Sequence, residues 1–305
     1  MRYEFVVTAA DADRRLDRFV ASHLDQAPMG LVRRLLRQKK IKVNGERPEA
    51  SRRLAAGDVV VVHHVARETT AATEPRPYEG PPIDVLDERE DFLFVNKPAG
   101  VACSDDGSDP AALARWLENA LAERIACGEV RPEPCHRLDR DTTGAVVVAL
   151  TAAAFDRFRR ALEAGAVTKE YEVVVHGRPS TAHFTVDTPL VRRGKVRADR
   201  PRMVAGDDGV DARTECSRLH DTETSSLLRA RPITGRTHQI RAHLRIAGLP
   251  VVGDPRYGDP ARDRAVAAPR GQLLHARRLT IDEDLGVEAP WPRDRWTWIE
   301  DHGLA

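Results

Sequence analysis

One apolar run constrains the fold more than any other feature of this 305-residue chain. The seven residues GAVVVAL, 144–150, follow directly on the polar stretch HRLDRDTT, 136–143. A short apolar run bounded by turn residues is typical of a buried strand. Just before it, five ionisable side chains crowd into six positions: His136, Arg137, Asp139, Arg140 and Asp141. This crowding indicates either a solvated, salt-bridged loop or a carboxylate that is held ready for chemistry.

The apolar segments around this strand predict one α+β domain over residues 83–305. Helices are expected over 111–125 and 152–165, and a turn followed by a helix is expected within 229–250. Further strands are expected within 83–101, 171–177, 183–191, 214–221 and 225–233. Mixed strands with few helices favour a mixed, largely antiparallel sheet that is flanked by helices.

Residues 1–65 are expected to form a separate, strongly basic domain. Between residues 14 and 53, twelve Lys and Arg residues stand against four Asp and Glu residues, whereas the whole chain has a net charge of +1. Apolar residues at helical spacing predict two short helices, and two short apolar runs joined by turn residues predict a small hairpin. Clustered cations favour RNA binding over an ordinary domain with solvated helix faces. The RNA contacts are expected at Arg33, Arg34, Arg37, Lys39, Lys40 and Lys42.

The rest of the composition narrows the class of protein. Residues 66–82 are polar and rich in proline, which predicts a linker between the two domains. The four cysteines lie far apart without a CxxC pair, so we expect reduced thiols and neither a zinc site nor a disulfide framework. The chain has no secretory signal and no apolar run long enough to span a membrane, so we expect a cytoplasmic protein. The GxSxG, HExxH and P-loop motifs are missing, which argues against common hydrolases, metalloproteases and NTPases.

Asp139 is the candidate for a reacting carboxylate. The guanidinium groups of Arg137 and Arg140 should keep it ionised, which suits a nucleophile or a general base better than a general acid. Local spacing alone nevertheless favours a salt-bridged surface loop. The role of Tyr171 is also undecided at this point. A strand tyrosine usually packs in the core, but it can also stack on a nucleobase or transfer a proton.

The segment RARPITGRTHQIRAHLRIAGLP, 229–250, contains a candidate anion site. Thr237 is expected to cap its helix. The side chains expected on one helix face, or at the helix N-terminus, are His238, Arg241, Arg245 and Arg236. They could bind phosphate or carboxylate groups, or they could form an ordinary solvated face.

Three segments in a fixed order carry a resemblance to a known family. HRLDRDTTG resembles the HRLDxxTSG signature of RluA-type pseudouridine synthases, with Thr143 in place of the usual serine. KEYEVVVHG looks like the K-x-Y strand motif of that family, and PITGRTHQIRAHL looks like its TGRTHQIRxH motif. GLPVVGDPRYGD and LLHARRL continue the resemblance, which covers residues 83–285. The basic domain is similar to the S4-like RNA-binding domain that many members carry.

The resemblance implies a pseudouridine synthase fold with a small α/β S4-like domain. It also implies an isomerase that converts specific uridines of RNA into pseudouridine with a catalytic aspartate, without a cofactor or a metal. The run APMGLVRRLLRQKKIKVNG is most like the synthases of large-subunit (23S) ribosomal RNA, and tRNA is the alternative target. We expect the protein to be a monomer that binds RNA and does not bind a membrane.

The same resemblance assigns roles to residues. Asp139 matches the catalytic aspartate and Tyr171 the active-site tyrosine. Arg241 matches the basic residue that pairs with the aspartate, and Arg236 of the same motif is the alternative. Arg137 matches an arginine that opens the RNA and holds the extruded uridine.

Three further residues have weaker assignments. Leu274 is expected in the pocket wall, and His238 and Arg245 are expected to contact RNA.

Two rival functions stay open: a non-catalytic RNA-binding protein that kept the fold, and an N-glycosidase that would release free uracil.

Overall fold

The computed structural model describes residues 2–24, 32, 35–63, 77–103, 109–194, 202–282 and 285–305. The chain divides into two compact units, Met1–Pro77 with Asp105–Pro110 and Tyr78–Ser104 with Ala111–Ala305. Most of the predicted linker, residues 66–76, lies outside the described residues. The domain boundaries at residues 65 and 83 therefore stay predictions.

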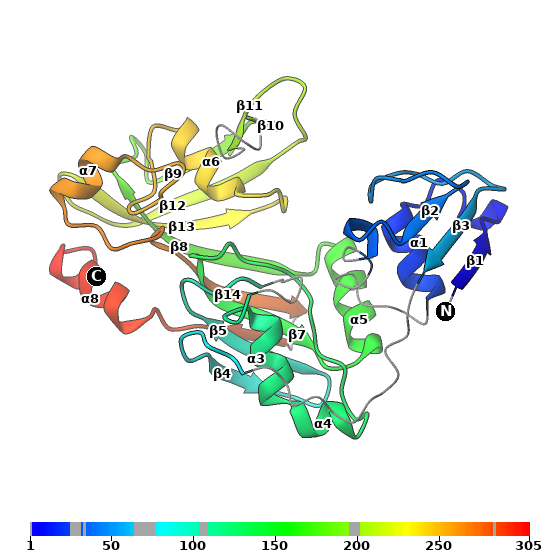
Figure 1. Ribbon diagram of the computed structural model, residues 1–305. Helices are drawn as coiled ribbons and strands as arrows, with labels where there is room; N and C mark the ends of the chain where they lie inside the picture. The colour runs from blue at the N-terminus through cyan, green and yellow to red at the C-terminus, as the bar shows by residue number, and fades with distance from the viewer. Residues whose placement is uncertain are drawn as a thin grey trace. The chain divides into compact units, whose positions relative to one another are not determined.

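The smaller unit is a three-stranded antiparallel sheet with a helix packed on it (Figure 1). Its elements are β1 (Arg2–Val6), η1 (Ala9–Asp11), α1 (Leu16–His23), β2 (Ile41–Val43) and β3 (Val59–His63). β3 lies between β1 and β2. Leu16, Phe19 and Val20 of α1 are buried in the core of this unit, as their helical spacing predicts. Asn44 and Gly45 both have positive φ, the conformation that an Asn-Gly turn provides.

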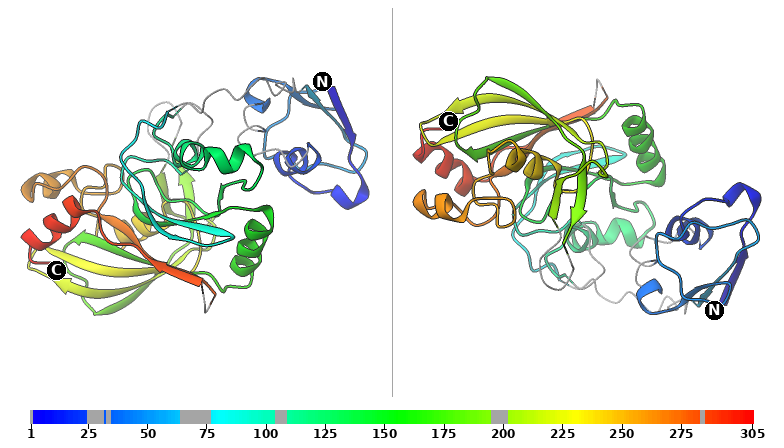
Figure 2. Two further views of the ribbon diagram at one scale, coloured as in Figure 1. Left: turned by 90° about the horizontal axis from the view of Figure 1, so that it is seen from below. Right: turned by 90° about the horizontal axis from the view of Figure 1, so that it is seen from above.

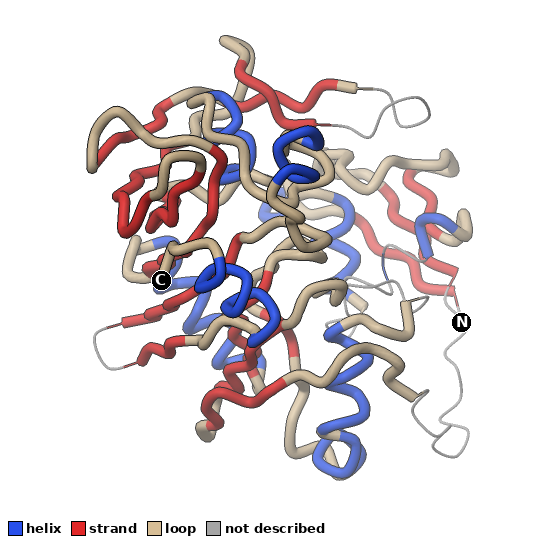
Figure 3. Tube along the Cα trace, turned by 90° about the vertical axis from the view of Figure 1, so that its left-hand side faces the viewer, coloured by secondary structure: helices blue, strands red, loops and turns tan. Residues whose placement is uncertain are grey.

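A ten-stranded mixed sheet organises the larger unit (Figures 1 and 3). The strand order is β4-β5-β7-β14-β8-β13-β12-β9, with β6 paired to β7 and β15 paired to β14. Among the strand pairs within the described residues, only β7 and β14 run parallel, which confirms the predicted mixed, largely antiparallel sheet. The strands of the sheet are β4 (Asp84–Glu88), β5 (Phe92–Lys97), β6 (Glu133–Pro134), β7 (Thr143–Ala149), β8 (Thr168–His176), β9 (His183–Asp187), β12 (Arg213–Asp221), β13 (Ser225–Pro232), β14 (Leu274–Asp282) and β15 (Leu285–Glu288). A separate hairpin consists of β10 (Leu190–Arg193) and β11 (Arg202–Ala205).

Helices flank the sheet on both faces, because its central strands are apolar on both sides (Figure 2). They are α3 (Leu113–Ala120), α4 (Ala122–Ala126), α5 (Ala152–Glu163), α6 (Gln239–Ile246), α7 (Pro260–Ala265) and α8 (Arg293–Asp301). On one face, α3 and α6 contribute to the cluster that buries Val146 and Val148. On the other face, α5 packs on Ala145 and Val147, and α8 belongs to the cluster around Val174.

The helix predicted over 111–125 is wrong in one respect, because it is interrupted at Leu121. α3 ends at Ala120 and α4 begins at Ala122. Apolar residues spaced by four drift by about 40° per step around a continuous helix. The interruption lets Leu113, Leu117 and Leu121 all stay buried in one cluster.

The parallel contact between β7 and β14 fixes the start of the buried strand. His275 is in register with Thr143, and Ala276 with Gly144. A Cβ atom on Gly144 would lie 2.4 Å from the carbonyl oxygen of Ala276, and the φ of this residue is +111°, so glycine is required there. Nε2 of His275 donates to the carbonyl oxygen of Ala289 over 2.9 Å, and Nδ1 accepts from the Thr143 hydroxyl over 2.8 Å. The imidazole is therefore buried and neutral.

This buried imidazole makes stability depend on pH. Burial lowers the pKa of His275 to about 3, whereas unfolding restores its ordinary value of 6.5. Between these two values the unfolded chain binds the additional proton, so the free energy of unfolding falls as pH falls. The contribution of this group is about 1.4 kcal/mol per pH unit.

Urea unfolding between pH 6.5 and pH 3 measures that contribution against His275→Gln, which keeps a donor for Ala289. The wild-type protein should show the steeper loss of stability. Equal slopes for the two proteins would contradict a buried, neutral His275.

Candidate active site

A buried lysine anchors the loop that carries Asp139. Lys97 ends β5, and its side chain is completely buried. Its ammonium group donates to three carbonyl oxygens, each 2.9 Å away, which belong to Pro98, Val101 and Arg140. Burial lowers the pKa of Lys97 to about 8, so the group is mostly cationic at neutral pH. The bond to Arg140 fixes the backbone immediately after Asp139.

Two further hydrogen bonds hold the same loop from other sides. The amide of Leu138 donates to Sγ of Cys103 over 3.2 Å. The side-chain amide of Gln272 donates to the hydroxyl of Thr142 over 2.9 Å. The backbone is therefore fixed on both sides of Asp139.

Arg241 joins Asp139 to a second carboxylate, that of Asp254. Nη1 of Arg241 donates to Oδ2 of Asp139 over 2.7 Å. Nε and Nη2 donate to the two oxygens of Asp254 over 2.6 and 2.7 Å. The side chain of Arg241 is 6% exposed, and that of Asp254 is fully buried. One guanidinium therefore serves two carboxylates, which its planar set of five donors permits.

Each charged group in this bridge stabilises the ionised form of its partner. Burial alone would lower the pKa of Arg241, but hydrogen bonds and charges from Asp254 and Asp139 raise it above its ordinary value. Burial alone would raise the pKa of Asp254, but Arg241 and two backbone amides lower it below its ordinary value. Both groups therefore stay charged at neutral pH. The sequence predicted a role for Arg241 but none for Asp254, whose signal was the motif GLPVVGDPRYGD.

The second oxygen of Asp139 is not used in this bridge. Among the residues that the structure describes, none forms a hydrogen bond with Oδ1. Nε2 of His238 lies 3.8 Å from it, which is beyond hydrogen-bond distance. The side chain of Asp139 is 21% exposed. Oδ1 is therefore available to a ligand while Oδ2 is held.

Tyr257 connects the groups beside Asp139. Its hydroxyl accepts from the amide of Met203 over 2.8 Å and lies 3.0 Å from Nδ1 of His238. Its ring lies 5.1 Å from Cζ of Arg241, a cation–π contact. Tyr257 was not predicted from the sequence, although it lies in the same GLPVVGDPRYGD motif as Asp254.

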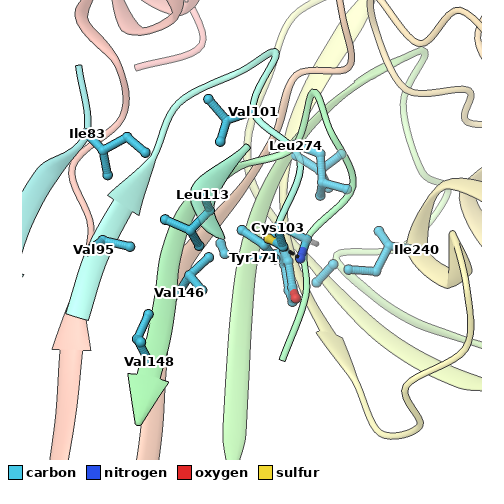
Figure 4. Close-up of a cluster of buried hydrophobic side chains, with 14 of the residues drawn as sticks. Ile83, Val95, Val101, Cys103, Leu113, Val146, Val148, Tyr171, Ile240 and Leu274 are labelled. Carbon is cyan, nitrogen blue, oxygen red and sulfur yellow. Dashed lines mark hydrogen bonds between the residues drawn. The ribbon is translucent and has the colours of Figure 1, made fainter. Parts of the chain in front are cut away.

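Tyr171 and Leu274 contribute to an apolar cluster next to this charged group. Figure 4 shows Tyr171 beside Cys103, with Leu274 and Ile240 close by. Burial, together with the nearby charge of Asp139, raises the pKa of Tyr171 above its ordinary value, so the phenol is neutral. The two residues predicted for the site lie on neighbouring strands, β8 and β14.

The structure separates the basic side chains that were expected to share one face of α6. Arg241 is buried, whereas Arg245, one turn further along, is exposed. The N-cap is His238, and the prediction of Thr237 in this position is wrong. Arg241 can turn inward because the buried carboxylate of Asp254 and the partly buried carboxylate of Asp139 compensate its charge.

Comparison with known proteins bears on the function of this arrangement. Residues 91–245 match the RNA pseudouridylate synthase family, and residues 14–60 match the S4 domain family. The Bacillus subtilis (strain 168) protein "Uncharacterized RNA pseudouridine synthase YlyB" is 32% identical over 97% of both chains. The chain belongs to the RNA pseudouridylate synthase family. It is an isomerase that acts on RNA.

Two other proteins are similar to this synthase. The Escherichia coli (strain K12) protein "Ribosomal large subunit pseudouridine synthase C" is 30% identical over 93% of this chain and 91% of its own. The solved structure "Human RNA Pseudouridylate Synthase Domain Containing 1" is 29% identical, with a TM-score of 0.56 over 69% of this chain and 83% of its own. The pseudouridine synthase fold and the N-terminal S4 domain are thereby confirmed.

The arginines predicted for the synthase occupy different environments. Arg137 is exposed and has no hydrogen-bond or ion-pair partner among the described residues. Nε of Arg236 donates to the carbonyl oxygen of Asp211 over 2.9 Å. Arg241, and not Arg236, is therefore the partner of Asp139 in the structure.

The cations predicted for the S4 domain lie at its surface where the structure describes them. Arg37, Lys39 and Lys42 are exposed, and Lys40 is partly exposed. The predicted contacts at Arg33 and Arg34 lie outside the described residues. Within the described part of the synthase, no helix is long and apolar enough to cross a membrane, and no cluster of His, Cys, Asp or Glu could hold a metal ion.

Removing the guanidinium that Asp139 and Asp254 share should destabilise the folded protein. Arg241→Met leaves two carboxylates without their partner, so we expect the free energy of unfolding to fall by about 3–5 kcal/mol. Arg245→Met, the matched change on the exposed side of α6, should alter it by less than about 0.5 kcal/mol. Urea denaturation of both variants measures the difference. Similar small losses in the two variants would argue against a buried charge bridge.

Proposed function

We propose that this synthase isomerises uridines of large-subunit ribosomal RNA and that Asp139 is its catalytic residue. The observation that carries the proposal is the unequal use of the two oxygens of Asp139. Oδ2 is bound to Arg241, whereas Oδ1 has no hydrogen bond with the described residues. A nucleophile or a general base requires an ionised oxygen that is fixed in position and open to the substrate.

The reaction exchanges one bond of uridine for another. The N1–C1′ bond breaks, the uracil turns, and C5 bonds to C1′. C5 loses a proton and N1 gains one, so the product is an isomer of the substrate. Asp139 either attacks C1′ or removes a ribose proton, and Oδ1 is the atom that serves in both cases. Arg241 supports both roles because its charged hydrogen bond to Oδ2 fixes the orientation of the carboxylate.

The surrounding side chains suit a nucleotide that has left its stack. Tyr171 offers an aromatic ring to the uracil, and Leu274 adds apolar surface to the pocket wall. Extrusion of a base costs a few kcal/mol, which contacts elsewhere must offset. Arg137 is placed to contribute, since its charge is exposed and has no partner among the described residues. Arg245 and the S4-domain cations would add phosphate contacts.

The ribosomal target is supported by similarity over nearly the whole chain. The E. coli relative named for the ribosomal large subunit aligns with 93% of this chain. The basic S4 domain would add salt-dependent affinity for RNA that does not depend on sequence. The enzyme is expected to be a cytoplasmic monomer, and tRNA is the alternative substrate.

Loss of the carboxylate charge should abolish the chemistry and leave the fold intact. Asp139→Asn keeps the shape of the side chain, so we expect no detectable pseudouridine, with RNA affinity and unfolding midpoint close to wild type. Asp141→Asn, two positions along the same loop, is the matched control and should retain turnover. Mass spectrometry of treated RNA measures the product. Turnover by Asp139→Asn would rule out the catalytic assignment, and release of free uracil by the wild type would indicate an N-glycosidase.

The substrate can be identified in cells. Deletion of the gene should remove pseudouridine from one or more sites of large-subunit ribosomal RNA, and a plasmid copy should restore them. A plasmid carrying Asp139→Asn should not. Mapping of ribosomal RNA and tRNA in the three strains measures this. Loss only in tRNA would contradict the ribosomal target, and loss nowhere would favour a non-catalytic RNA-binding protein.

A further inference from the structure

His238 presents one ring nitrogen to the unbound oxygen of Asp139. The residue caps α6 with a φ of 53° and a ψ of 23°, a left-handed conformation that is uncommon for a residue with a Cβ atom. Nε2 lies 3.8 Å from Oδ1 of Asp139, and the His238 side chain keeps 16% exposure. Backbone strain of this kind occurs preferentially where a side chain must be aimed at a ligand.

The hydroxyl of Tyr257 determines which nitrogen of His238 carries the proton. Its oxygen accepts the amide proton of Met203, and its own proton can then be donated to Nδ1 of His238. In this arrangement Nδ1 is an acceptor, and the proton of the neutral imidazole lies on Nε2. Burial lowers the pKa of His238 below its ordinary value, against the opposing charge of Asp139. A neutral N–H donor therefore faces Oδ1.

We propose that His238 recognises the ribose 2′-hydroxyl of the target uridine through this Nε2–H. The inference rests on the proposed role of Asp139, in which Oδ1 reaches C1′ or a ribose proton beside it. The 2′-oxygen is bonded to C2′, the neighbour of C1′, and therefore lies close to Oδ1. A hydroxyl between the two groups can donate to Oδ1 while it accepts from Nε2, which explains a gap too wide for a direct bond.

The two buried cations near Asp139, Arg241 and Lys97, are engaged in contacts within the protein. Nε, Nη1 and Nη2 of Arg241 are bonded to Asp139 and Asp254. The three ammonium protons of Lys97 are matched by three carbonyl oxygens. His238 is thus placed to supply the selectivity for RNA, because the 2′-hydroxyl is the group that distinguishes RNA from DNA.

Affinity for two RNA oligonucleotides tests the proposal. Both contain the uridine identified by mapping the deletion strain, and they differ only in a 2′-hydroxyl or a 2′-hydrogen at that nucleotide. Every protein carries Asp139→Asn, so that the bound uridine is not converted, and fluorescence anisotropy gives the dissociation constants. The side-chain amide that replaces the carboxylate keeps its oxygen on Arg241 and turns its NH2 group towards the 2′-oxygen. This contact is common to all the proteins compared, so differences between them report residue 238. With His238 intact, we expect the ribose form to bind at least about fivefold more tightly, because the hydrogen bond from His238 alone accounts for that factor.

Two variants at His238 separate recognition from structure. His238→Leu removes the donor and should lower the ratio of the two dissociation constants by about fivefold. His238→Gln keeps a neutral N–H and should retain most of the discrimination. A purely structural role would weaken both oligonucleotides equally and leave the ratio unchanged.

A tyrosine pair tests the control of the tautomer. Tyr257→Phe keeps the ring against Arg241 but removes the proton donated to His238, so the ratio should fall. Tyr78→Phe is the matched control, because it removes a hydroxyl bonded to the carbonyl oxygen of Pro81. It should leave the ratio unchanged.

The proposal is overturned if His238→Leu discriminates as well as His238, or if the protein with His238 does not discriminate. Conversion of the ribose oligonucleotide by the Asp139→Asn protein would instead rule out the proposed role of Asp139. The two failures are therefore distinguishable.

Discussion

The bridge from Asp139 through Arg241 to Asp254 is the interaction on which the rest of the site depends. A buried guanidinium is tolerated only where its donors are bonded and its charge is compensated, and here two carboxylates do both. Asp254 is fully buried and binds two donors of Arg241, which leaves Nη1 for Asp139. The bridge therefore holds one oxygen of Asp139 and leaves the other open.

The loop around Asp139 is made rigid by satisfied polar groups. Lys97 bonds three carbonyl oxygens, and Thr142 and Thr143 are bonded to side chains at the start of β14 or just before it. Gly144 lets β7 and β14 approach closely where no Cβ would fit. Fixed geometry of this kind lowers the cost of aligning a substrate with the reacting group.

The sequence predicted the strands and helices of this site better than the ion pairs between its side chains. A continuous apolar run predicted the buried strand β7, and a segment closed by Gly165 predicted the helix α5. The resemblance assigned Asp139, Tyr171 and Arg241 to one site. The sequence could not predict the role of Asp254. A single carboxylate after an apolar segment gives no sign that it is buried, because its partner Arg241 comes from a distant segment. The inward turn of Arg241, beside an exposed Arg245, was missed for the same reason: helical spacing carries no information about a partner from a distant loop.

The most direct test of this account is a crystal structure of the Asp139→Asn protein with an RNA that contains the target uridine. We expect the uridine to lie outside its stack, with its ribose against residue 139 at the position of Oδ1. Arg241 should still join residue 139 to Asp254. A uridine that remains stacked, or an Arg241 that leaves Asp254 to bind an RNA phosphate, would contradict the account.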